Sequence, residues 1–244
     1  MQDGYAGDMG DYGKFALLRA IARTTELRLG LHWWLTSAGG RPNDGRHTTY
    51  LTTPRGERRY RPPDPNLYDA LRSIVTRGTR TVAALQEAAL IRGPATYFAE
   101  RLDYDGIPLA MRVRHREAWL ARAVETFTHC DVVLLDPDNG LEVTSTGIRA
   151  QKAPKYVFIH EARELAGRRS VIVYQHLDRS GKAADQMRRR MRQLAIGSEP
   201  FVVRHHRGTG RAYLFLPAPE HRNDLRRAAD VLLATWPRDF TLVA

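Results

Sequence analysis

The feature that most constrains the fold is an apolar run that stops abruptly at a group of polar residues. Residues 132–135 are Val-Val-Leu-Leu, and Asp136-Pro137-Asp138-Asn139-Gly140 follow them directly. A continuous apolar run of this kind is typical of a strand buried on both faces of a parallel sheet. In open α/β sheets, ligands bind just beyond the carboxyl ends of the strands. The sequence therefore predicts an α/β fold with a candidate site at this strand end.

A second strand is predicted a short distance further along the chain. Residues 170–174 are rich in β-branched side chains and lead into Gln175 and His176. The segment between the two strands holds about one helix, as a parallel βαβ crossover requires. Parallel strands would bring Asp136, Asp138 and His176 to one edge of the sheet, where a carboxylate and an imidazole suit acid–base chemistry. The alternative is that Asp-Pro-Asp-Asn-Gly is only a turn, since these residues are common turn formers.

The remaining sequence alternates between helical and strand patterns. Helices are expected at residues 14–24, with Asp11 as the N-cap, and at 64–75, 112–128, 154–166, 183–195 and 219–236. Residues 29–35 predict a strand, 78–91 fit either a strand or a helix, and 201–204 with 211–216 predict a hairpin. This order predicts one α/β domain over residues 1–244. We expect a three-layer sandwich with a central mostly parallel or mixed sheet, a C-terminal β-hairpin and a long basic loop at about 36–63.

The overall charge of the chain points to a nucleic-acid partner. The 244 residues include 38 Lys and Arg against 27 Asp and Glu, a formal net charge of +11. Such a balance favours binding to DNA, with RNA as a possible partner, although an ordinary basic enzyme is the alternative. The single Cys130 excludes an internal disulfide framework and a cysteine-rich zinc site. No apolar run reaches the ~20 residues of a membrane span. No secretion signal is recognised, so we expect no membrane partner and a cytoplasmic location.

Clusters of arginine supply the candidate contacts to nucleic acid. The predicted contacts are Arg58, Arg59, Arg61, Arg188, Arg189, Arg192, Arg204 and Arg207. Tyr60, Trp33 and Trp34 are predicted to offer stacking surfaces beside them. The alternative for each cluster is a solvated protein face.

Several further residues are candidates for the site itself. The cluster Asp8, Asp11 and Lys14 is predicted either to lie beside the same sheet edge or to cap the first helix. Glu161 is interpreted either as a metal ligand together with Asp136 or as part of a solvated helix face, and His205 and His206 as backbone-contacting or solvent residues. The complete set of predicted substrate contacts is Asn139, Asp8, Asp11, Lys14, Gln175, Arg179 and Ser180.

Two families resemble parts of this sequence. Asp136-Pro137-Asp138-Asn139-Gly140 resembles the water-activating motif of uracil-DNA glycosylase-like enzymes, and His176 with Ser180 nearby is similar to their second motif. This resemblance implies that Asp136 or Asp138 positions a water and that His176 stabilises the departing base. It also implies that residues 177–181 approach the DNA backbone. No cofactor and no metal are then required.

The same strand end also resembles the Asp-Pro-Pro-aromatic motif of adenine-N6 methyltransferases, which grips an exocyclic amine. Residues 7–18 and 36–40 are similar to parts of ribosomal-RNA adenine methyltransferases. This second resemblance implies S-adenosylmethionine as a cofactor.

The function predicted from the sequence is hydrolysis of the N-glycosidic bond of an extruded, modified or damaged base in DNA. An S-adenosylmethionine-dependent adenine methyltransferase acting on DNA or RNA is the first alternative. A metal-dependent nuclease built from Asp8, Asp11, Asp136 and Glu161, and a non-catalytic nucleic-acid-binding module, are the others. The sequence predicts no oligomeric state.

Overall fold

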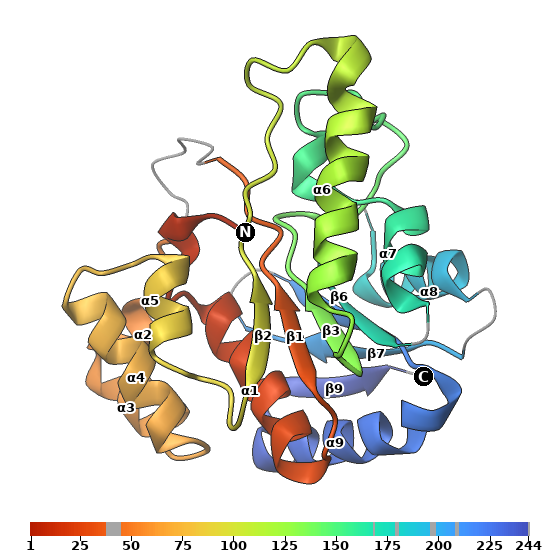
Figure 1. Ribbon diagram of the computed structural model, residues 1–244. Coiled ribbons are helices and arrows are strands. Elements are labelled where there is room, and N and C mark those ends of the chain that lie inside the picture. The colour runs from red at the N-terminus through yellow and green to blue at the C-terminus, as the bar shows by residue number, and fades with distance from the viewer. Residues whose placement is uncertain (38–44, 168, 179–180, 196–198, 208–209, 244) are drawn as a thin grey trace.

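A single mixed sheet forms the centre of the protein. The computed structural model describes residues 1–37, 45–167, 169–178, 181–195, 199–207 and 210–243. Within these residues, seven strands pair in the order β2-β1-β3-β6-β8-β7-β9 (Figure 1). Their bounds are β1 Leu29–His32, β2 Ala95–Phe98, β3 Val132–Leu135, β6 Ser170–His176, β7 Phe201–His205, β8 Arg211–Leu216 and β9 Phe240–Val243. The first four strands in this order are parallel, and the last three join by antiparallel pairing.

Helices cover both faces of the sheet and complete the expected three-layer α/β sandwich. One face packs against α1 (Met9–Thr24) and α9 (Arg222–Thr235), with α4 (Pro65–Thr76) and α5 (Val82–Glu87) beside them. The other face packs against α6 (Arg112–Thr126), α7 (Ile159–Ala166) and α8 (Ala183–Leu194). Alternate residues of β3 serve the two cores, since Val132 and Leu134 belong to the first and Val133 and Leu135 to the second. The prediction of a strand buried on both faces is confirmed.

The order of the parallel strands creates a switch point next to the predicted site. From β1 the chain passes to β2 on one side and then returns to β3 on the other side. Ligands bind at such switch points in open α/β sheets. Strands β3 and β6 are parallel neighbours with α7 in the crossover, and Leu135 pairs with Val173. The predicted crossover is therefore confirmed, and both strand ends lie at one edge.

Several local elements differ from the sequence predictions. The predicted loop at 36–63 contains two short helices, α2 (Thr49–Thr52) and α3 (Pro54–Tyr60). Proline at the first helical position and the Thr53 side chain, which accepts from Gly56 N, start α3. The first helix begins at Met9 with Asp8, not Asp11, as its N-cap. The ambiguous segment 78–91 forms α5, and the strands β2 and β9 were not predicted.

The hairpin prediction is confirmed for its described residues. Strands β7 and β8 pair antiparallel, with Phe201 opposite Phe215 and His205 opposite Arg211, while Gly208 and Thr209 of the turn lie outside the described residues. The segment predicted as a helix at 154–166 is α-helical only from Ile159, since a 3-10 turn and a short strand come before it. The remaining short elements are β4 (Gly140–Leu141), β5 (Tyr156–Val157) and the 3-10 helices Asp3–Tyr5, Leu109–Met111, Ala153–Lys155 and Pro219–His221.

Three aromatic residues predicted to stack on bases instead belong to the interior. Trp33 and Trp34 are fully buried, and Tyr60 is 9% exposed. The Trp34 indole donates to the Pro154 carbonyl oxygen at 3.0 Å, and Trp33 packs edge-on against Phe15. The prediction of exposed stacking surfaces was therefore wrong, because the two tryptophans follow the buried strand β1 directly and stay in the interior. No described helix is long and apolar enough to cross a membrane.

Two other polar residues are also more buried than the sequence suggested. His205 has no exposed surface and stacks on Phe240, with ring centroids 4.7 Å apart. It lies so close to α1 that a Cβ on Gly13 would come within 2.6 Å of its ring, which explains the glycine in that helix. Glu161 is 1% exposed and forms a buried ion pair with Arg116. The interpretations of His205 as a solvent or backbone-contacting residue and of Glu161 as part of a solvated face were wrong.

Candidate active site

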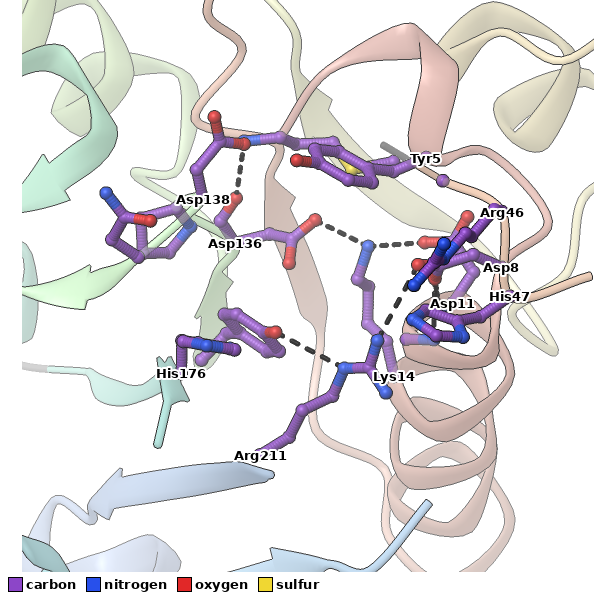
Figure 2. A pocket seen from close by; sticks show the side chains of 16 residues that line it. Tyr5, Asp8, Asp11, Lys14, Arg46, His47, Asp136, Asp138, His176 and Arg211 are labelled. Atoms are coloured by element: carbon purple, nitrogen blue, oxygen red, sulfur yellow. Dashed lines mark hydrogen bonds and ion pairs between the residues drawn. The ribbon is translucent and has the colours of Figure 1, made fainter. Parts of the chain in front are cut away.

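A cavity of about 370 Å³ lies at the carboxyl ends of β3 and β6, beside the first turns of α1 (Figure 2). We call it the site pocket. Seven residues predicted from the sequence line it: Asp8, Asp11, Lys14, Asp136, Asp138, Asn139 and His176. Five polar residues that the sequence did not single out join them: Tyr5, Arg46, His47, Tyr174 and Arg211. Asp136 and His176 thus belong to one pocket and not to opposite edges of the sheet.

The centre of the pocket is a buried lysine held between two carboxylates. Lys14 Nζ lies 2.7 Å from Asp11 Oδ1 and 2.5 Å from Asp136 Oδ2. Asp11 and Lys14 are three residues apart and therefore share one face of α1. Asp136 follows β3 directly, and its backbone N–H still donates to His32 O at 3.0 Å. The Trp33 ring lies 4.7 Å from Lys14 Nζ and adds a cation–π contact.

Burial and charge act in opposite directions on these groups. Burial raises the pKa of Asp136 above its ordinary value, although the Lys14 ammonium acts against the shift. Burial raises the pKa of Asp11 in the same way, again opposed by Lys14. Burial alone would lower the pKa of Lys14, but Asp11 and Asp136 overcome it and raise that pKa. The lysine therefore stays charged, and Asp136 is a more basic carboxylate than an exposed aspartate.

A second group of charges lies at the N-terminus of α1, in the same pocket. Asp8 Oδ1 accepts from the N–H groups of Gly10 and Asp11, while its Oδ2 lies 3.6 Å from Arg211 Nη2. Both interpretations of Asp8 are therefore met, because it caps the helix and also lines the pocket. Arg211 also donates from Nε to Tyr174 Oη at 3.3 Å (Figure 2).

His176 lines the pocket from the end of β6, where it pairs with Arg211 of β8. Burial and the positive charge of Arg211 lower the pKa of the imidazole below its ordinary value. The ring is therefore neutral at pH 7 and can both accept and donate a hydrogen bond.

Asp138 is bonded to the N-terminal segment. Its Oδ1 lies 2.9 Å from the Met1 amino group, and its Oδ2 accepts from Gln2 Nε2 at 2.6 Å. Burial alone would raise the pKa of Asp138, but the Met1 amino group and the Gln2 amide lower it below the ordinary value. Asp138 is thus a charged carboxylate with both oxygens engaged. In Asp136, by contrast, Lys14 binds one oxygen, Oδ2.

Gln175 lies behind the pocket wall and not in it. Its Oε1 accepts from Leu141 N at 2.9 Å, and its Nε2 donates to the carbonyl oxygens of Asn139 and His176. Gly140 has a φ of +96°, and a Cβ there would meet the Gln175 amide at 2.6 Å. The geometry contradicts the predicted substrate contact of Gln175, because its amide holds the turn after β3. Arg179 and Ser180 lie outside the described residues.

The arginines predicted to contact nucleic acid divide into two groups. Four of them form ion pairs within the protein: Arg59 and Arg207 with Asp239, Arg61 with Asp69, and Arg188 with Asp185. The other four, Arg58, Arg189, Arg192 and Arg204, have no ion-pair partner in the described part of the chain. Arg188, Arg189 and Arg192 are all exposed on α8.

The acidic set considered for a metal-dependent nuclease is not assembled. Both oxygens of Glu161 are engaged, since Oε2 accepts from Arg116 Nη2 at 2.9 Å and from Phe158 N at 2.7 Å, while Arg116 Nε bonds to Oε1. Glu161 does not line the site pocket with Asp8, Asp11 and Asp136. In the described residues, no three His, Cys, Asp or Glu side chains are grouped so that they could hold a metal ion.

The residues missed by sequence reasoning reach the pocket through long-range pairing. The register of β6 with β8 places Arg211 opposite His176 and Tyr213 opposite Tyr174. His47 is joined to α1 because its carbonyl oxygen accepts from Met9 N at 3.1 Å. No local motif marks these residues, although a correct hairpin register would have brought Arg211 to the site.

The sequence matches no protein-family model and shows no significant similarity to a curated protein. The chemistry of the site therefore rests on its geometry. The site pocket combines four carboxylates with Lys14, Arg46, Arg211 and the Met1 amino group, and it adds a neutral imidazole. Such a pocket can bind a polar organic group and stabilise charges of both signs as they develop in a reaction.

Proposed function

We propose that this protein excises a base from DNA by hydrolysing its N-glycosidic bond. The base would leave the helix and enter the site pocket, at a cost of a few kcal/mol for unstacking. The observation that supports the proposal most is that Asp136 and His176, from the ends of neighbouring parallel strands, line one cavity of about 370 Å³. Ligand pockets for small molecules begin at about this size.

The charge distribution of the pocket suits this reaction. When the bond from C1′ to the base nitrogen breaks, its electron pair leaves with the base and positive charge develops on the sugar. Asp136 would stabilise that positive charge and accept the proton of the attacking water, whose hydroxyl joins C1′. His176 and Arg211 would face the negative charge of the departing base, since both line the same pocket.

Lys14 sets the protonation state of Asp136 in this scheme. An isolated carboxylate buried to this degree would be protonated easily. The ammonium group 2.5 Å from Oδ2 keeps Asp136 ionised and leaves Oδ1 to accept a proton. Lys14 is therefore a positioning residue that acts through Asp136.

An adenine methyltransferase is the second candidate. That resemblance rests on the strand end at 136–139, on residues 7–18 and on residues 36–40, and described residues of all three segments meet at the pocket. Lys14 contacts Asp136, and Thr36 Oγ1 donates to Asp138 Oδ2 at 3.3 Å. The described part of the proposed cofactor loop does not fit S-adenosylmethionine, however. Thr36 N donates to Met1 O and the Met1 amino group donates to Trp34 O, so the N-terminal segment covers this strand end. Asn139 also replaces the motif's aromatic residue.

The proposal is tested with purified protein and duplex DNA that carries normal, deaminated or alkylated bases, without a methyl donor. We expect abasic sites, scored as alkali-labile strand breaks, on at least one of these substrates. S-adenosylmethionine titrated into the protein in a calorimeter provides the comparison. Heat of binding together with an absence of abasic product would exclude the glycosylase and support the methyltransferase.

Replacing Arg189 by Ala is expected to weaken DNA binding without changing the base that is excised. Arg189 is exposed on α8 and has no ion-pair partner among the described residues, so its charge is available to a phosphate. Loss of one phosphate contact should reduce the slope of log K against log salt by about 1. Titrations at several salt concentrations measure this slope, and an unchanged slope would remove Arg189 from the DNA interface.

The activity should fall on the acid side at a higher pH than an ordinary aspartate would give. Asp136 must be ionised, and burial raises its pKa above the usual ~3.9. Activity is therefore present above the raised pKa and is lost as pH falls through it. His176 is already neutral at pH 7, because its pKa is lowered, and it adds no loss at higher pH. A profile of kcat/KM that stays flat down to about pH 4 would contradict this assignment.

A further inference from the structure

A second cavity adjoins the site pocket, and the described residues that line it carry basic side chains without acidic ones. It measures about 360 Å³ and lies against α2 and α3, where Thr49, Arg55, Arg59 and Tyr60 contribute to its lining. We call it the α3 hollow. Its lining residues, taken from the described part of the chain, include two arginines and no Asp or Glu. The site pocket, in contrast, contains four aspartates.

The two cavities meet at one residue. His47 lines both of them, and its backbone oxygen is fixed to α1 by the hydrogen bond from Met9 N. A ligand in the site pocket therefore lies next to the α3 hollow. An anionic group attached to it would meet the arginines of the hollow, while its other polar groups would meet charges of both signs in the site pocket.

The arginines of the α3 hollow have capacity for an anion. Arg55 is exposed and has no ion-pair partner among the described residues. Arg59 Nη2 pairs with Asp239 Oδ1 at 3.2 Å, but its Nε is buried without a hydrogen-bond partner in the described structure. Arg59 also lies over the Tyr60 ring, with the guanidinium carbon 5.2 Å from the ring centroid, and this cation–π contact favours its observed position. Guanidinium groups with free N–H donors are well suited to phosphate oxygens.

We propose that the α3 hollow binds a phosphodiester group of the nucleic-acid strand, next to the nucleotide whose base occupies the site pocket. The position of this phosphate next to the nucleotide in the site pocket rests on the proposed function. Phosphate binding by Arg55 and Arg59 does not depend on any reaction. Residues 55–61 contain four arginines, and of these only Arg55 and Arg59 line the hollow.

The test is the salt dependence of binding to a fluorescent oligothymidylate of about twelve nucleotides, a length that spans a typical single-strand site. Arg55→Ala is expected to lower the affinity and to reduce the slope of log K against log salt by about 0.7, the value for one phosphate on a single strand. Arg55→Lys keeps the charge and should retain most of the slope. Arg92→Ala is the matched control, because Arg92 is exposed and does not line the α3 hollow.

If Arg55→Ala and Arg92→Ala lowered the affinity and the salt slope equally, the proposal would be overturned, because the effect of Arg55 would then come from net charge alone. Competition with thymidine monophosphate identifies the source of the phosphate. If the mononucleotide displaced the oligonucleotide as effectively, per phosphate, as unlabelled oligothymidylate, the occupant would be a free nucleotide and the strand assignment would be wrong. The measured quantity is binding and not base excision, so a lack of base excision would leave this result unaffected.

Discussion

Replacing Asp136 by Asn should reduce the rate of base excision by about 10²–10⁴-fold, the range expected when a general base is lost. Asparagine has the same shape as aspartate but cannot take the proton of the attacking water. Lys14 keeps Asp11 as a charged partner at 2.7 Å, so the buried ammonium group is not left alone. We therefore expect kcat to fall while DNA affinity and the melting temperature change little.

Asp69→Asn is the matched control for this variant. Asp69 forms an exposed ion pair with Arg61, and its side chain is 46% exposed. The same chemical change at this position should leave activity unaltered. An Asp136→Asn protein with wild-type activity would rule out Asp136 as the catalytic carboxylate. If the variant were inactive only because it is unfolded at the assay temperature, Asp136 would have a structural role.

Replacing Glu161 by Ala should cause the largest loss of stability. Arg116 is 1% exposed and lies between Glu161 and the carbonyl oxygens of Ala153 and Tyr156. Removing one member of a buried ion pair leaves the other charge uncompensated and costs about 3–5 kcal/mol. For a protein of this size the melting temperature should fall by about 6–20 °C, at about 2–4 °C per kcal/mol. Calorimetry or circular dichroism measures the shift.

Two further variants separate this effect from a general loss of charge. Asp131→Asn breaks a pair whose arginine, Arg28, is 63% exposed, and it should lower the melting temperature far less than Glu161→Ala does. The double variant with Arg116→Met and Glu161→Leu should recover much of the stability, because it removes both buried charges. A Glu161→Ala variant as stable as Asp131→Asn would contradict the account of this ion pair.

Local sequence patterns were sufficient for the central strands but not for the edges of the sheet. The apolar run ending at Leu135 and the β-branched run from Ser170 predict β3 and β6 because both strands are buried on two faces. β2 and β9 are four-residue strands with partly exposed side chains, so their patterns are short and mixed. Their position depends on pairing with β1 and β7, which local propensity does not encode.

Burial of charged side chains was the least predictable property. Glu161 sits in a His-Glu-Ala-Arg-Glu sequence that is typical of an exposed helix, and its partner Arg116 is 45 residues away. The same holds for Arg211, which reaches the pocket only through the register of β6 with β8. In contrast, Asp8, Asp11 and Lys14 could be proposed from the sequence because they lie close together at the start of the first predicted helix.

The most direct test of the central claim is the formation of abasic sites under single-turnover conditions, with wild-type protein and Asp136→Asn compared on the same damaged duplex. We expect alkali-labile breaks with the wild-type protein, in the absence of a methyl donor, and a rate lower by at least about 10²-fold with the variant. Equal rates for the two proteins, or no abasic product on any damaged or normal base, would contradict the assignment of base excision to this pocket.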